Sequence, residues 1–320
     1  MDSVLLIGTG GYSVWYSNDL GQSISRLRSD AGLYSESAVY AMSPDPTEPG
    51  RVLVGTDSGL YELDLATMIF QPIDSPMNGM SIWSIAFSPH DPSVVLAGTR
   101  KPATVFRSED RGRTWLPTQA KFPQTCAFVL TPRVTRICMS RQMAGHAWAS
   151  LELGGVWHSA DDGRSWQRAS EGLVSDDVHD ISSWRERLFV ATNRGLHISN
   201  DGAASWRRVD LDLPAPQYLR TVLPLGDDTD DVLLGAGDGP PGSIGQLMRS
   251  RDGGDSWSHV NLPGPLQSTL YAITAHPARP GLLFASTALG QTYRTTDGGS
   301  SWTALPRRLG DVRSLTLAIR

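Results

Sequence analysis

The chain has 320 residues, of which 40% are hydrophobic, and a formal net charge of −5. That hydrophobic share suffices for a globular core, and the length suits one large all-β domain. Lys101 and Lys121 are the only lysines, and no run of basic residues occurs. The composition therefore argues against a nucleic-acid partner, because neutralising phosphates requires clustered cations.

The beginning of the chain, MDSVLLIGTGG, has no basic segment, and its apolar run is too short for a signal peptide or a membrane span. No other apolar stretch reaches the length of a span. Two cysteines, Cys126 and Cys138, are too few for a disulfide scaffold or a zinc site. We therefore expect a cytoplasmic protein with no membrane partner.

An octapeptide recurs along the chain. A weak copy, SNDLGQSI, begins at Ser17, and near residue 62 the segment GLYELDLATMIFQPI keeps the apolar runs without the motif. Five intact copies follow: SEDRGRTW at Ser108, SADDGRSW at Ser159, SNDGAASW at Ser199, SRDGGDSW at Ser250 and TTDGGSSW at Thr295. Seven periods of about 46 residues fill the chain and predict one domain over residues 1–320.

Each period contains three short apolar runs, the octapeptide and a fourth run, with Pro, Gly, Asn and Asp between them. Four strands per period predict a seven-bladed β-propeller. The final segment DVRSLTLAI matches a first strand, whereas SVLLIGTGGYSVWYSND near the beginning matches strands two and three. The first blade is therefore expected to contain both ends of the chain.

The pattern S/T-x-D-x-G-x-x-W resembles the Asp-box, or BNR, repeat. This repeat occurs in sialidases, sortilin-type receptors, xyloglucan-cleaving glycosidases and photosystem II assembly factors. The resemblance covers the whole chain and implies the propeller fold without implying one function. The octapeptides themselves are interpreted as structural, because copies scattered around a ring cannot converge on one ligand.

The starts of the seven inner strands are expected to line a central pocket on the face opposite the octapeptides. Their buried anchors are aligned as Val39, Ile82, Val134, Val178, Leu219, Leu270 and Val312. The residues after the anchors form a first ring: Tyr40, Trp83, Thr135, His179, Arg220, Tyr271 and Arg313. A register error of one residue would reverse the face on which a side chain lies.

The first ring predicts a site for a small anionic ligand with an aromatic or sugar-like body. Arginine recognises carboxylates and phosphates through paired hydrogen bonds, and aromatic rings provide stacking surface. The predicted substrate-binding residues are Arg220, Arg313, Arg136, Arg133, Tyr40, Trp83 and Tyr271. Arg136 and Asp180, which follow the ring residues on adjacent blades, are alternatively a salt bridge in the channel.

Asp177, His179 and Asp180 begin one inner strand and are the candidate catalytic residues. A carboxylate beside an imidazole suits acid–base chemistry, although turn-capping aspartates beside a surface histidine would give the same pattern. The ring offers one histidine, so no metal is expected, and no redox cofactor motif is present. Any reaction would be that of a hydrolase or lyase.

Two functions remain open from the sequence. The first is a hydrolase-like enzyme, or a binder, that acts at the central pocket on an anionic small molecule by hydrolysis or elimination. Sialidase chemistry itself fits poorly, because those enzymes have six blades and an Arg-Ile-Pro segment. The second is a non-catalytic scaffold that binds a protein partner, as the propeller assembly factors do.

Overall fold

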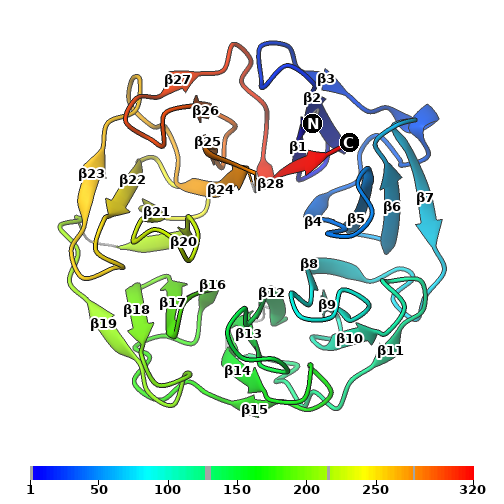
Figure 1. The fold of residues 1–320 in the computed structure, drawn as a ribbon, viewed down its shortest axis with the longest axis horizontal. Helices are drawn as coiled ribbons and strands as arrows, with labels where there is room; N and C mark the ends of the chain where they lie inside the picture. Colours follow the sequence, from blue (N-terminus) through cyan, green and yellow to red (C-terminus); the bar gives the residue numbers. More distant parts are fainter. Residues whose placement is uncertain (1–2, 127–130, 215–216, 277) are drawn as a thin grey trace.

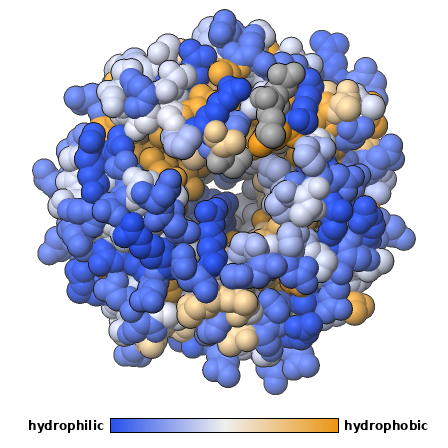
Figure 2. Space-filling view, viewed as in Figure 1, coloured by the Kyte–Doolittle hydropathy of each residue, from blue (hydrophilic) through white to orange (hydrophobic). Residues whose placement is uncertain are grey.

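A computed structural model describes residues 3–126, 131–214, 217–276 and 278–320. In these ranges the chain forms antiparallel strands and one short 3-10 helix, η1 (Ser29–Ala31). The described strands form a ring of six sheets (Figure 1): five contain four strands each, and one contains two groups of four, β8–β11 and β12–β15, joined by the pair Arg100–Arg133. The space-filling view shows a hollow, the central channel, in the middle of this ring (Figure 2). No helix in the described ranges is long and apolar enough to cross a membrane. The predicted all-β propeller is confirmed.

Within each group of four, the strands are ordered in four levels from the centre of the ring outward, as first (inner), second, third and fourth strands. The inner strands are β28 (Val312–Ile319), β4 (Val39–Pro44), β8 (Ser81–Phe87), β12 (Arg133–Met139), β16 (Val178–Trp184), β20 (Tyr218–Pro224) and β24 (Leu270–His276). The second strands are β1 (Ser3–Thr9), β5 (Arg51–Thr56), β9 (Val95–Arg100), β13 (Ala147–Glu152), β17 (Arg187–Thr192), β21 (Val232–Gly237) and β25 (Arg279–Thr287).

The outer two levels are shorter. The third strands are β2 (Val14–Ser17), β6 (Leu60–Asp64), β10 (Val105–Ser108), β14 (Gly155–Ser159), β18 (Gly195–Ser199), β22 (Gly245–Ser250) and β26 (Thr292–Thr295). The fourth strands are β3 (Ser25–Arg26), β7 (Ile69–Ile73), β11 (Leu116–Pro117), β15 (Gln167–Arg168), β19 (Arg207–Val209), β23 (Ser258–Val260) and β27 (Thr303–Ala304).

The two ends of the chain meet in one sheet. β28 pairs antiparallel with β1, so that Leu317 lies opposite Leu5 (Figure 1). β28 also contacts β24 on one side and β4 on the other, and every other inner strand contacts its neighbours. The ring of described strands therefore joins its last element to its first, as the matching terminal segments predicted.

The core lies between neighbouring sheets. One buried cluster combines Val4 and Leu6 of β1 with Val52 and Val54 of β5, and similar layers separate the other sheets. The second strands are buried on both faces, so they are nearly continuous apolar runs rather than alternating ones. Each sheet depends on its neighbours to bury its faces.

The octapeptides form hydrogen-bonded turns after the third strands. In the copy that begins at Ser250, the Ser250 hydroxyl donates to Asp252 and accepts the amide of Gly254. Asp252 also accepts the Ser256 amide at 2.9 Å, and the Trp257 indole donates to the Gly254 carbonyl at 3.1 Å. The polar groups of the motif are used inside the turn, which supports its structural interpretation.

Candidate functional site at the channel mouth

The seven first-ring residues share one backbone irregularity. Val178 pairs with Thr192 and Asp180 pairs with Ala191, so His179 is the extra residue of a β-bulge. The same shift in register occurs at the other six ring residues, Tyr40, Trp83, Thr135, Arg220, Tyr271 and Arg313. Bulges re-aim side chains and are frequent beside binding sites. The alignment on apolar anchors therefore identified seven equivalent positions.

Side chains from three inner strands stack at one side of the channel mouth, the end of the channel surrounded by the seven first-ring residues. The rings of Tyr40 and Trp83 are stacked, with centroids 4.0 Å apart and planes 11° apart. The Arg133 guanidinium lies 4.0 Å from the centroid of a Trp83 ring and forms an ion pair with Glu152. Burial lowers the pKa of Arg133, and the Glu152 charge opposes this shift. The aromatic side chains of the ring thus pack on one another and on an arginine.

Two further arginines lie at Tyr271. The Arg220 guanidinium is 4.8 Å and the Arg313 guanidinium 5.9 Å from the centroid of the Tyr271 ring. Arg313 forms an ion pair with Asp311 at 2.9 Å. These distances are within the range of cation–π interactions. Predicted binding residues from neighbouring inner strands therefore do meet.

His179 is held by the backbone of the next inner strand. Its Nδ1 atom donates to the Leu219 carbonyl at 2.6 Å, and its ring lies 4.5 Å, between centroids, from the ring of Tyr218. Its Nε2 atom faces Asp177 Oδ1 at 3.4 Å. The His179 side chain has no exposed surface, whereas 18% of the Asp177 side chain is exposed. The structure thus places Asp177 against the imidazole, as expected.

Asp180 lies apart from this pair. Its Oδ1 atom accepts the Ile181 amide at 3.0 Å, and its Oδ2 atom accepts the Val222 amide at 2.9 Å. Arg136 Nε is 3.6 Å from Asp180, which matches the alternative of a salt bridge between adjacent sheets. Burial raises the pKa of Asp180. Its contacts are those of a residue that joins β16 to β20.

Glu152 also lies at the mouth but was not among the residues predicted from the sequence. It is the last residue of β13 and lies directly opposite Arg133 in the sheet. Arg100 ends β9 in the same way and also pairs with Arg133. The signal was a charged residue at the end of an otherwise apolar second strand. That end of the strand lies at the channel mouth because second strands run antiparallel to inner strands.

Two cavities lie outside the predicted site. One, of about 510 Å³, is lined by Trp184, Arg187 and Asn200, and the other, of about 540 Å³, is lined by His158, Arg168 and neighbouring residues. Neither contains a predicted site residue. One face of the molecule is hollowed at the centre of the ring and surrounded mostly by hydrophilic side chains (Figure 2).

Comparisons with known proteins agree with this architecture. A family model described as photosynthesis system II assembly factor YCF48 matches residues 173–316. No curated protein matches the chain. Together with the solved structures that the chain resembles, the match identifies the chain as a BNR-repeat β-propeller.

Many solved structures resemble the fold, among them the following three. The GH74 xyloglucanase from Xanthomonas campestris is 19% identical with a TM-score of 0.68, and the match covers 93% of this chain and 46% of the enzyme. YCF48 bound to D1 peptide is 13% identical with a TM-score of 0.60, covering 88% and 93%. YCF48 from Cyanidioschyzon merolae is 13% identical with a TM-score of 0.60, covering 86% and 87%. The chain thus spans about half the length of the xyloglucanase.

Proposed function

We propose that the protein is a binding module that holds a carboxylate-bearing ligand at the channel mouth. The observation that carries this proposal is that Arg220 lies at the mouth without an ion pair. The arginine ion pairs at the mouth use Arg133, Arg136 and Arg313. Arg220 forms no ion pair with a carboxylate of the described residues, and it is half-buried beside Tyr271. The carboxylates of Glu152 and Asp180 act on it only from a longer distance.

A partly desolvated guanidinium with no carboxylate in direct contact favours an anion. A carboxylate could accept two hydrogen bonds from Arg220, and the apolar body of the ligand could lie against aromatic side chains of the ring. The proposal is limited to binding. Hydrolysis or elimination would need a substrate atom to reach His179 Nε2, and the His179 side chain has no exposed surface.

A second candidate is a protein segment whose terminal or side-chain carboxylate enters the same mouth. The structure of YCF48 bound to D1 peptide supports this candidate, because a protein of similar fold binds a peptide. In that case the protein acts as an interaction scaffold. The same Arg220 would contact the carboxylate.

The test is a thermal-shift screen against aliphatic, aryl and sugar carboxylates and against inorganic phosphate. A ligand that binds the folded state raises the melting temperature by mass action. We expect a rise with a carboxylate that disappears in Arg220→Gln and persists in Arg185→Gln. Arg185 is a suitable control because it forms an exposed ion pair with Asp230 away from the mouth.

Labelled peptides separate the two candidates. Each peptide is measured by fluorescence polarisation with a free and with an amidated C-terminus. Tight binding of a peptide, without any small carboxylate, would favour the scaffold. If neither small carboxylates nor peptides depend on Arg220, the proposal is wrong.

A further inference from the structure

Two buried acceptor atoms face each other at the mouth. Because His179 Nδ1 donates to the Leu219 carbonyl, the neutral imidazole carries its lone pair on Nε2. Nε2 lies 3.4 Å from Asp177 Oδ1. Both atoms are buried, and neither is hydrogen-bonded to any group of the described residues. Two lone pairs at this distance need a positive centre between them.

A third acceptor lies beside the pair. One carboxylate oxygen of Glu152, one ring nitrogen of His179 and one carboxylate oxygen of Asp177 are all within 4.8 Å of one another. Glu152 forms an ion pair with Arg133, but a carboxylate has about four acceptor positions and retains capacity for a second partner. The three side chains come from β13 and from the start of β16.

The spacing of His179 Nε2 and Asp177 Oδ1 suits coordination of a small ion. Two ligand atoms about 2.1 Å from a tetrahedral zinc ion lie about 3.4 Å apart. The contact from His179 Nδ1 to a backbone carbonyl is the support that metal-binding histidines commonly have, because it fixes the tautomer and the ring orientation.

We propose that Glu152, Asp177 and His179 bind one divalent transition-metal ion, for which Zn²⁺ is the probe. The imidazole nitrogen favours zinc and its neighbours over Mg²⁺ and Ca²⁺, which prefer oxygen ligands alone. The two carboxylates match the charge of the ion. Three protein ligands would leave one coordination position open. The site is independent of the carboxylate ligand proposed for Arg220.

The competing arrangement is a doubly protonated imidazole that forms an ion pair with Asp177. This arrangement also places a positive centre between the two atoms. It predicts a proton on Nε2 that added metal does not displace. The metal proposal predicts instead that Zn²⁺ binds Nε2.

The test is isothermal titration calorimetry of the chelator-treated full chain with ZnCl₂. We expect one ion per chain in the wild type, and loss of that binding in His179→Gln, Asp177→Asn and Glu152→Gln. His259→Gln is the matched control. His259 is exposed on the outer strand β23, and its ring bonds the Asp212 carbonyl. Arg220→Gln should retain Zn²⁺ binding, which separates this proposal from the preceding one.

Two readouts guard against variants that misfold. Far-ultraviolet circular dichroism identifies folded variants, and Glu152→Gln and Asp177→Asn alter partly exposed side chains. Nitrogen-15 NMR of labelled histidine should show a shift of the His179 Nε2 resonance on addition of Zn²⁺. Absence of stoichiometric binding, or wild-type binding by a folded His179→Gln, would overturn the proposal.

Discussion

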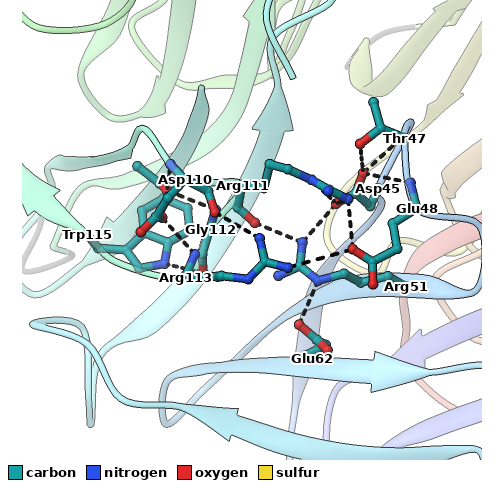
Figure 3. Close-up of polar contacts among 11 residues, drawn as sticks. Asp45, Thr47, Glu48, Arg51, Glu62, Asp110, Arg111, Gly112, Arg113 and Trp115 are labelled. Carbon is teal, nitrogen blue, oxygen red and sulfur yellow. Dashed lines mark hydrogen bonds and ion pairs between the residues drawn. The ribbon is translucent and has the colours of Figure 1, made fainter. Parts of the chain in front are cut away.

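Arg111 Nη2 lies 2.8 Å from Asp45 Oδ2, and this ion pair joins two neighbouring sheets (Figure 3). Arg111 belongs to an octapeptide turn after β10, whereas Asp45 follows β4. Asp45 also pairs with Arg51 at 2.9 Å and accepts the amide and hydroxyl of Thr47. The Asp45 side chain has no exposed surface. The buried Asp45 carboxylate therefore connects the segment after β4, strand β5 of its own sheet, and the octapeptide turn of the neighbouring sheet.

Asp45→Asn is expected to lower the free energy of unfolding by about 3 kcal/mol. The substitution leaves the buried Arg51 without one of its charge partners, and uncompensated buried charge is costly. Urea denaturation followed by tryptophan fluorescence measures the effect. The control is Asp30→Asn, which changes an exposed aspartate. Equal stability of the two variants would contradict this role for Asp45.

The fold could be predicted because its signals are local and repeated. Ser250, Asp252 and Gly254 make their hydrogen bonds within one turn, so the motif alone identifies the turn. The seven ring positions could be aligned because each follows a fully buried anchor such as Val178, although the bulges at these positions were not predicted.

The contacts between side chains around the mouth could not be predicted from the sequence. Glu152 meets Asp177 and His179 only because β13 and β16 are brought together by packing between sheets. The different contacts of Asp177 and Asp180, the two aspartates near His179, could not be predicted from the sequence either. Asp177 turns toward the imidazole, whereas the bulge directs Asp180 to the Val222 amide. Such choices depend on contacts between residues distant in sequence.

Asp180→Asn is expected to lower stability while preserving ligand binding at Arg220. The amide group keeps one acceptor oxygen and therefore loses one of the two hydrogen bonds to the backbone amides of Ile181 and Val222. Leaving a buried donor unsatisfied costs about 1–3 kcal/mol. Chemical denaturation and the carboxylate titration are measured on the same variant. A loss of binding without a loss of stability would instead indicate direct contact with the ligand.

Small residues in the second strands permit the close approach of neighbouring sheets. A Cβ atom added at Gly235 would lie 2.6 Å from the Leu270 carbonyl oxygen of the next inner strand. Gly8, Gly55 and Gly98 have similarly close neighbours at the corresponding positions of other sheets. The backbone cannot move away without opening the contact between two sheets.

Gly235→Ala is therefore expected to cost about 1–3 kcal/mol, the usual range for overpacking a core. Gly239→Ala is the matched control, because its nearest neighbour to an added Cβ atom is 3.9 Å away. Urea unfolding of both variants gives the comparison. If Gly235→Ala is as stable as Gly239→Ala, the sheets do not require a glycine there.

The octapeptide aspartates are expected to make stability sensitive to acid. Hydrogen bonds from the Ser205 hydroxyl, the Ser199 hydroxyl and the Ser205 amide lower the pKa of Asp201 to about 2. An unfolded aspartate has a pKa of about 3.9. Because the folded pKa is the lower one, this contribution is fully present above about pH 4 and is lost as the pH falls through about 2.

Asp201→Asn should therefore be less stable than the wild type at neutral pH, and the difference should shrink between about pH 4 and pH 2. Urea denaturation at a series of pH values measures the difference in unfolding free energy directly. Asp30→Asn again serves as the control, since Asp30 is exposed and accepts no hydrogen bond from another described residue. A difference between wild type and Asp201→Asn that stays constant down to pH 2 would show that the charge of Asp201 does not stabilise the turn.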